Sequence, residues 1–395
     1  MISEPNNTHQ KHVKLTKPDL GLFGRNELAI LGTPCGQIKK LAHALTEILS
    51  ANHQITYVDA DHASAREASA IDPRSALAHK ASLEATDKID FQRFDLLDHP
   101  NEYNQKGFYY DQDIVLVNGN HFLAQSQIAV IDPKKPLDRK LAKLTDIKLF
   151  LLQSTAEGIP DFIKDHDPDW AAIPVLRIDQ CQEIAEFIGS WHEQRRPKVK
   201  GLVLAGGKSQ RMQQDKGLLD YHGQAQRDHL YEQLKPFCSE TYISCRQEQQ
   251  VDLEEQQEAV VDRFLGLGPF GALLSAFMSD PNAAWLAVAC DLPFLTDQSL
   301  QFLVDHRDTS KVATTFKSPF DEFPEPLITI WEPRAYPKLL HFLGLGYSCP
   351  RKVLINSNAK ILDPPQANEL KNINHPEEYK QALKQIQEQR KQSTV

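Results

Sequence analysis

The stretch GLVLAGGKSQRMQQDKGLLDYHG, residues 201–223, joins an apolar strand to a glycine turn and a cluster of cations. Gly206 and Gly207 follow the apolar residues, so the backbone can turn sharply there and approach a ligand closely. Three cations come directly afterwards: Lys208, Arg211 and Lys216. Ligands of open α/β sheets bind at the carboxyl ends of strands, where backbone amides and cations can hold phosphate oxygens. Ala-Gly-Gly alone is typical of a plain turn, but strand, turn and cations together predict a phosphate site.

The rest of the chain alternates short β-rich runs with helical segments, and it does so in both halves. Alternation of this kind predicts parallel sheets with crossover helices. We therefore expect the α/β fold class, with two three-layer α/β/α domains. The expected strands are 27–32, 53–61, 113–119, 127–133 and 147–154 in the first half, and 200–207, 240–245, 284–291, 311–316 and 326–331 in the second.

A helical segment separates the two halves. Residues 181–200 carry an apolar stripe at helical spacing, formed by Ile184, Phe187, Ile188 and Trp191. The charged run EQRRPK then interrupts the pattern just before the strand at residue 200. We therefore place the boundary near Arg196–Pro197, which gives domains 1–196 and 197–395. The tail KQALKQIQEQRKQSTV predicts a further helix.

Composition excludes several classes of partner. The chain has 395 residues, enough for about two domains, and its net charge of −9 provides no general basic field for nucleic acid or an anionic membrane. The six cysteines are scattered without a C-x-x-C pair, which argues against a zinc site and suits a reducing cytoplasm. The first residues are polar, and no apolar run approaches the about 20 residues of a membrane span. We expect a cytoplasmic protein.

Two further motifs place polar groups near strand or helix ends. Asp291 ends the apolar run 284–290 and precedes Pro293, an arrangement in which Mg²⁺ can bridge protein and phosphates, although a helix cap is the common alternative. Asn374 is placed to cap a helix that starts at His375–Pro376, with acidic residues in its first turn. Gly268–Pro269 predicts a tight turn before another helix.

In order, these motifs resemble those of the MobA-type nucleotidyltransferases, the molybdenum cofactor guanylyltransferases. LAGGKSQRMQQDKGLL is similar to the family signature LAGG-x-S-x-RMG-x-DK-x-LL, with Gln213 in place of the usual glycine. Three later segments also resemble the family: DRFLGLGPFGALLSAF at 262–277, Asp291-Leu292-Pro293, and EPLITIW at 325–331. KNINHPEEY resembles N-x-N-T-PEE, with His375 in place of threonine. The resemblance covers residues 199 to about 380.

The resemblance implies a Rossmann-like nucleotide-diphospho-sugar transferase fold for the second domain. It implies transfer of GMP from Mg²⁺-bound GTP to the phosphate of molybdopterin or the molybdenum cofactor, with release of pyrophosphate. Mg²⁺ is the implied cofactor; molybdoenzymes or their chaperones are further implied partners. The implied catalytic residues are Arg211, Lys216 and Asp291, and the implied metal ligands are Asp291 and Asn374. The implied nucleotide-binding residues are Leu204, Ala205, Gly206, Gly207, Lys208, Lys216, Asp262, Gly268, Pro269 and Asp291.

The choice of base is less strongly indicated than the transfer itself. Ser244, Cys245 and Arg246 stand where the family often has an asparagine that helps to read the nucleoside. A transferase of the same fold that uses CTP or a sugar phosphate is therefore an alternative, as is a non-catalytic nucleotide-binding scaffold. We interpret Cys245 as a small residue at a strand end, because no histidine partner for a nucleophile is apparent.

The first half resembles the MobB-type GTP-binding proteins through AILGTPCGQIKKLAHAL at 29–45 and DIVLVNGNHF at 113–122, where Asn118 replaces the usual acidic residue. Its P-loop departs from the motif G-x-x-x-x-G-K-[ST] in two ways. Gly32 and Gly36 are one residue closer than the two glycines of the motif, and Gln37 and Ile38 stand in place of its lysine and its Ser/Thr. We expect a P-loop-NTPase-like domain without GTPase activity that docks the substrate, a partner or another subunit. We interpret three polar groups here as a strand-end turn rather than a metal site: Asp59, Asp61 and His62.

Overall fold

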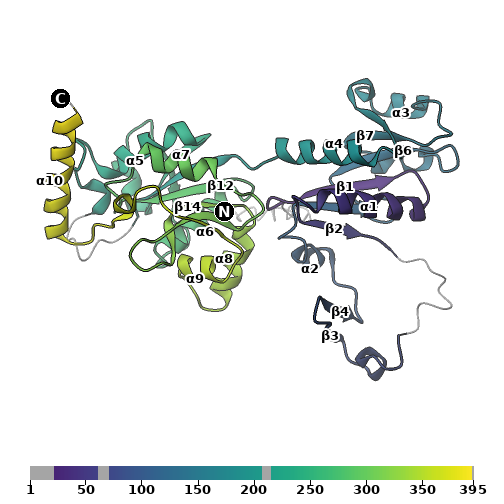
Figure 1. Ribbon diagram of the computed structural model, residues 1–395, viewed down its shortest axis with the longest axis horizontal. Coiled ribbons are helices and arrows are strands. Elements are labelled where there is room, and N and C mark those ends of the chain that lie inside the picture. Colours follow the sequence, from purple (N-terminus) through teal and green to yellow (C-terminus); the bar gives the residue numbers. More distant parts are fainter. Residues whose placement is uncertain (1–21, 61–70, 207–214, 394–395) are drawn as a thin grey trace, which may run out of the picture.

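The computed structural model describes residues 22–60, 71–206 and 215–393. Figure 1 shows two α/β units, each built on its own sheet, with helix α4 (Cys181–Gln194) leading from the first unit toward strand β9 (Val199–Leu204) of the second. The boundary that we predict at residues 196–197 lies between these two elements, and we keep it as the proposed domain limit. None of the described helices combines the length and the apolarity that a membrane span requires.

The N-terminal sheet is entirely parallel, with strand order β2-β5-β1-β6-β7-β8. Its central strands are fully buried, as expected for a sheet covered on both faces. Helix α1 (Cys35–Leu49) packs with α4 on one face, and α3 (Asp161–His166) contributes Ile163 to the core of the other. The strands are β1 Asn26–Leu31, β2 Ile55–Val58, β5 Ile114–Asn118, β6 Ser126–Ile131, β7 Ile147–Leu152 and β8 Val175–Arg177.

A two-stranded hairpin outside this sheet was not expected from the sequence. Strands β3 (Leu83–Asp87) and β4 (Gln92–Leu96) pair antiparallel, after the short helix η1 (Ala76–His79) and before α2 (Glu102–Gly107). Figure 1 shows them standing away from the parallel sheet. The hairpin buries little of its surface, so the hydrophobic pattern of its sequence gives only a weak signal.

The C-terminal sheet is mixed, which corrects the expectation of a parallel sheet in this half. Its order is β11-β10-β9-β12-β14-β13-β15, and β14 runs antiparallel to both of its neighbours. The reason lies in the connection of β13 (Ala313–Lys317) to β14 (Pro324–Trp331), which is too short for the crossover that a parallel pair needs. The other strands are β10 Glu240–Cys245, β11 Glu258–Val261, β12 Ala284–Ala289 and β15 Lys360–Leu362.

Helices cover both faces of the mixed sheet, so the three-layer prediction is confirmed. One face packs against α5 (Gln226–Leu234) and α7 (Asp297–Asp305). The other packs against α6 (Pro269–Ser279), α8 (Ala335–Gly344) and α9 (Pro350–Ile355). Helix α10 (Pro376–Ser393) lies at the end of the molecule farthest from the first unit (Figure 1) and forms a small core of its own with Leu219, Tyr221 and Ile373.

The two units meet through a buried ion pair. Arg334, at the start of α8, donates from Nη2 to Asp113 Oδ1 at 2.6 Å, and from Nη1 to the carbonyl oxygen of Asp111 at 2.8 Å. The side chains of Arg334 and Asp113 are only 2% and 1% exposed. A second pair, Lys338 with Asp111 at 2.9 Å, lies at the surface beside it. The buried pair therefore ties the base of the parallel sheet to the mixed-sheet unit.

Replacing one partner of the buried pair should destabilise the protein strongly. Arg334→Ala leaves the Asp113 carboxylate buried without its cation, which costs about 3–5 kcal/mol in comparable cases. Lys338→Ala is the matched control, because its pair is exposed and worth at most about 1 kcal/mol. Urea denaturation of both variants measures the difference, and equal losses in the two would contradict this view of the interface.

Candidate functional site

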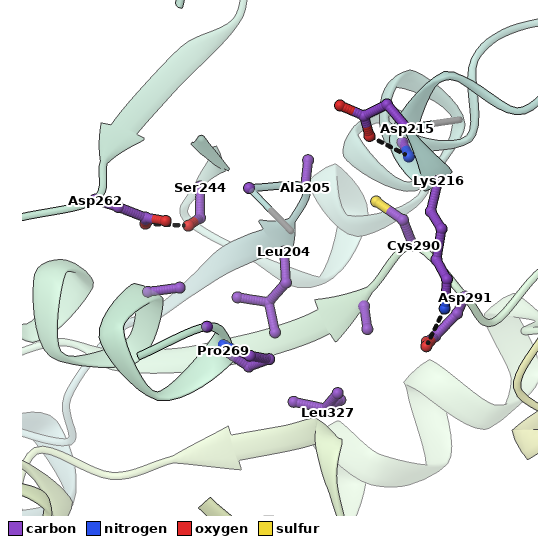
Figure 2. A pocket seen from close by; sticks show the side chains of 15 residues that line it. Leu204, Ala205, Asp215, Lys216, Ser244, Asp262, Pro269, Cys290, Asp291 and Leu327 are labelled. Atoms are coloured by element: carbon purple, nitrogen blue, oxygen red, sulfur yellow. Dashed lines mark hydrogen bonds and ion pairs between the residues drawn. The ribbon is translucent and has the colours of Figure 1, made fainter. Parts of the chain in front are cut away.

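A cavity of about 240 Å³ lies at the carboxyl ends of β9, β10 and β12. These three strands are parallel neighbours, so their carboxyl ends share one edge of the sheet. Figure 2 shows the side chains that surround the cavity. It is lined by Leu204, Ala205, Gly206, Asp215, Lys216, Gly217, Ser244, Asp262, Gly268, Pro269, Ala272, Ala289, Cys290, Asp291 and Leu327. The fold thus brings together motifs that are far apart in the sequence.

Lys216, Asp291 and Asn374 meet on one side of this cavity. The Nζ of Lys216 donates to Asn374 Oδ1 at 2.6 Å and lies 3.3 Å from Asp291 Oδ2. The backbone N–H of Ile373 donates to the carbonyl oxygen of Asp291 at 2.9 Å, which fixes the segment before α10 against the end of β12. One ammonium group therefore joins three separate segments at the strand ends.

The carboxylate of Asp291 is poised to bind a cation. Burial raises the pKa of Asp291, and the nearby ammonium of Lys216 opposes that shift. Its Oδ1 is buried and has no hydrogen-bond partner among the described residues. A buried carboxylate oxygen without a donor is costly, and a metal ion would remove that cost.

The donor set fits Mg²⁺ that is shared with a substrate. Within the described ranges, no group of three or more His, Cys, Asp or Glu side chains could hold a metal ion by itself. Mg²⁺ is commonly held by one or two carboxylates, with waters and substrate phosphates completing its shell. Asp291 Oδ1 could supply one such oxygen, and Asn374 is close to Asp291 because both side chains contact the Nζ of Lys216.

Asp262 and Ser244 form the opposite side of the cavity (Figure 2). Ser244 Oγ donates to Asp262 Oδ1 at 2.8 Å, and the Asp262 backbone N–H donates to the carbonyl oxygen of Cys245 at 2.9 Å. Burial raises the pKa of Asp262, while Ser244 and Arg246 act in the other direction. A Cβ on Gly206 would lie 2.8 Å from Asp262 Oδ2, so glycine is needed there to let the carboxylate approach the strand end.

The turn that we predict at Gly268–Pro269 forms one wall. Gly268 has a φ of 56°, a left-handed conformation that favours glycine, and Pro269 begins α6. A Cβ on Gly271 would collide with the carbonyl oxygen of Phe264, so the loop from Asp262 closes tightly over the start of the helix. The loop therefore holds Asp262 and Pro269 on the same cavity.

Three predicted site residues lie outside the described residues: Gly207, Lys208 and Arg211. Leu204, Ala205 and Gly206 line the cavity directly before them. The capping role that we predict for Asn374 is wrong, because its side-chain oxygen accepts from Lys216. Glu378, in the first turn of α10, reaches back to the residues before the helix as in a capping box: its Oε2 accepts from the backbone N–H groups of Asn374 at 2.7 Å and His375 at 3.0 Å.

No role is predicted from the sequence for two residues, Asp215 and Gln249, that hold the backbone next to Lys216. Asp215 Oδ1 accepts from the backbone N–H of Gly217 at 2.9 Å, and its Oδ2 accepts from Gln249 Nε2 at 2.7 Å. The Asp-Lys pair within the motif signals Asp215, but nothing in the sequence indicates that Gln249 reaches it. Cys245 is buried, and burial raises its pKa to about 11, in agreement with a packing role.

The corresponding edge of the N-terminal sheet has different chemistry. Asp59 accepts from Asn118 Nδ2 at 2.6 Å and from Tyr57 Oη at 2.8 Å, so both oxygens of its carboxylate are hydrogen-bonded within the protein. Lys39 and Lys40 are exposed on α1. Asp61 and His62 lie outside the described residues, so the reading of these groups as a turn stays a prediction.

Comparison with known proteins gives a family match in the C-terminal half. Residues 201–360 match the family description MobA-like NTP transferase domain. A molybdenum cofactor biosynthesis bifunctional protein of Synechocystis is 32% identical over 200 residues, which are 50% of this chain and 58% of that protein. The chain therefore spans little more than half the length of this relative. A solved molybdopterin-guanine biosynthesis protein B is similar over 42% of this chain and 99% of its own, with 15% identity and a TM-score of 0.31.

A shorter relative is covered almost completely. A probable molybdenum cofactor guanylyltransferase of Carboxydothermus hydrogenoformans is 30% identical over 190 residues, which are 46% of this chain and 93% of that protein. The match spans nearly the whole of a protein of that kind, and the family description covers the cavity from Leu204 to Leu327. Through its C-terminal half, the chain belongs to the MobA-like NTP transferase family, related to the molybdenum cofactor guanylyltransferases.

Proposed function

We propose that the chain transfers GMP from GTP to the terminal phosphate of molybdopterin or the molybdenum cofactor and releases pyrophosphate. The observation that carries this proposal is the convergence of Lys216, Asp291 and Asn374 at the strand ends, with one buried oxygen of Asp291 left for a cation. The match to the MobA-like NTP transferase family and the sequence similarity to a probable molybdenum cofactor guanylyltransferase support the proposal.

The proposed reaction needs no protein nucleophile. A phosphate oxygen of the acceptor forms a bond to the α-phosphorus of GTP, while the bond from that phosphorus to the bridging oxygen of the β-phosphate breaks. Pyrophosphate leaves with the bonding electrons. Lys216, together with Arg211, provides positive charge where negative charge gathers during transfer, which is the main requirement of phosphoryl chemistry. When bound by Asp291 and Asn374, Mg²⁺ supplies further neutralisation of the phosphate oxygens.

The proposed nucleoside contacts lie across the cavity from Lys216. Ser244 donates to Oδ1 of Asp262, and among the described residues Oδ2 accepts no hydrogen bond, so we assign it to a ligand. Guanine presents N–H donors on its pairing edge, and a carboxylate oxygen is an acceptor for them. Gly206 and the Gly268–Pro269 turn give the ligand close access to the backbone.

The N-terminal domain is proposed to dock a substrate, a partner or another subunit rather than to hydrolyse GTP. Gln37 and Ile38 cannot supply the phosphate-binding ammonium or the metal-binding hydroxyl of an active P-loop. In an Asp291→Asn variant of the whole chain, the proposed transferase site is disabled. Any GTP hydrolysis that remains would then come from the N-terminal domain. We expect negligible release of inorganic phosphate from GTP by that variant, and brisk release would overturn the assignment.

The base preference can be measured directly. The protein is incubated with Mg²⁺, a molybdopterin-bearing acceptor and either GTP or CTP, and pyrophosphate release is followed. We expect release with GTP and little with CTP. CTP is the appropriate comparison because Ser244 and Cys245 occupy the place of the family's asparagine. Preferential release with CTP would assign the chain to a cytidylyl branch, and release with neither would contradict the proposal.

Asp291→Asn and Lys216→Met should each lower turnover by a factor of about 100 or more, the usual effect of removing a group that stabilises charge in the transition state. Matched controls are Asp305→Asn, at the exposed end of α7, and Lys235→Met, on the surface beside Glu232. Steady-state rates of pyrophosphate release measure the effect. Unchanged turnover in Asp291→Asn would show that the metal assignment is wrong.

Gly206→Ala should weaken nucleotide binding while leaving the fold intact. The new methyl group would push against Asp262 Oδ2, the end of a side chain that can move only by giving up its bond to Ser244. Gly344→Ala is the control, since a Cβ there meets nothing within 4 Å. Isothermal titration with GTP and Mg²⁺ should show an affinity about tenfold lower for Gly206→Ala, which corresponds to about 1.4 kcal/mol. Equal affinities in both variants would remove Asp262 from the nucleotide site.

A further inference from the structure

The three segments that carry Lys216, Asp291 and Asn374 meet a second time, at the side chain of His222. Its Nε2 lies 3.0 Å from the carbonyl oxygen of Pro293, in the loop that follows Asp291. Its Nδ1 lies 3.2 Å from Nη2 of Arg390, on the helix α10 that follows Asn374. The same Arg390 nitrogen donates to the carbonyl oxygen of His222 at 3.0 Å. One imidazole therefore joins all three segments.

These contacts allow a single protonation state of His222. A carbonyl oxygen only accepts, so Nε2 must carry the proton that it donates to Pro293. A guanidinium only donates, so Nδ1 must accept from Arg390 and cannot carry a proton. His222 is therefore neutral and in the Nε2–H form. Burial, the largest effect, and the positive charge of Arg390 lower the pKa of His222, in agreement with this state.

Packing around His222 reinforces the junction. Its ring stacks on that of His229 of α5, with centroids 3.9 Å apart. Beside it, Tyr379 of α10 donates from its hydroxyl to the carbonyl oxygen of Asp220 at 3.0 Å, and its ring contacts Tyr221 edge to face. A small apolar core continues the contact with α10; it contains Leu219, Tyr221, Ile373, Ala382 and Ile386.

We propose that His222 is a positioning residue for the transfer reaction: its neutral imidazole holds α10 and the loop after Asp291 in the register that places Asn374 and Asp291 around Lys216. This inference rests on the proposed function for its catalytic consequence, although the docking of α10 can be measured without it. Among the described residues, no hydrogen bond joins the nucleoside side of the cavity, with Asp262 and Ser244, to α10 or His222.

The geometry predicts a loss of rate rather than of nucleotide affinity. Without the imidazole bonds, the segments that carry Asn374 and Asp291 lose a shared anchor, and the 2.6 Å contact of Lys216 with Asn374 loosens. Displacements of about 1 Å in reacting groups can cost up to about 100-fold in rate. Asp262 and Gly206 stay in place, so the KM for the nucleotide should change little.

The test compares two substitutions at His222 with a control. His222→Phe keeps the aromatic stack but removes both hydrogen bonds, while His222→Gln retains a donor and an acceptor. His306→Phe is the matched control, because His306 also stacks on a ring, that of Phe302, and bonds a carbonyl oxygen, but is exposed at the end of α7. For each variant, kcat and KM are measured by pyrophosphate release, and the exchange of α10 amide hydrogens by mass spectrometry.

We expect His222→Phe to lower kcat by about 10- to 100-fold, with KM for the nucleotide within about twofold of the wild type and faster exchange in α10. His222→Gln should recover most of the rate and the slow exchange, and His306→Phe should match the wild type. Wild-type kcat and exchange in His222→Phe would overturn the inference. The inference would also be overturned if His222→Phe and His222→Gln lost kcat equally while the exchange of the α10 amide hydrogens stayed unchanged. An inactive wild type would refute the proposed function, while the exchange data would still decide the docking of α10.

The acid dependence gives a second readout. Protonation of His222 would place a proton on Nδ1 against Arg390, with His229 stacked on its ring and the negative charge of Asp220 acting in the opposite direction. Since the folded protein disfavours the charged imidazole, docking of α10 should weaken as the pH falls below about 6.5, the ordinary pKa of histidine. The protection factors of the α10 amides, which are exchange rates corrected for the intrinsic pH dependence of amide exchange, should fall at acid pH in the wild type and less so in His222→Gln. The same acid dependence in both would contradict the role of His222.

Discussion

The site depends on the ammonium group of Lys216. It lies between Asn374 Oδ1, 158 residues away in the sequence, and Asp291 Oδ2, 75 residues away. A buried carboxylate is costly without a nearby cation, so the position of Asp291 at the end of β12 requires Lys216 beside it. The parallel neighbours β9 and β12 bring the two chain segments to the same edge, and the antiparallel β14 extends the sheet beyond them. The position of the cavity at this edge is therefore a direct consequence of strand direction.

Much of the site could be predicted because its parts are local in sequence. An apolar run ends at Gly206 and another ends at Asp291, so the sequence itself marks where each of these two strands ends. Contacts between distant segments have no such pattern: nothing near Asp215 indicates Gln249, and nothing near His222 indicates Pro293 or Arg390. The same holds for the mixed sheet, where the length of one connection, not the strand sequences, sets the direction of β14.

The two halves show how fold and chemistry separate. The N-terminal sheet keeps parallel order and a fully buried centre, yet the residues that follow β1 lack the side chains of a working P-loop. The carboxylate of Asp59 accepts hydrogen bonds from Asn118 and Tyr57 within the protein. The contact of the first unit with the second centres on a buried ion pair, Asp113 with Arg334, at the base of the sheet. This supports a role in docking or support, with chemistry in the second unit.

The fate of labelled GTP tests the central claim most directly. With an acceptor and Mg²⁺ present, label at the α-phosphate should appear in the acceptor product, and label at the γ-phosphate should appear in pyrophosphate. That outcome shows transfer of the nucleotidyl group to the acceptor. Label from the γ-phosphate in inorganic phosphate, with none from the α-phosphate in the acceptor, would show a hydrolase instead and would contradict the account.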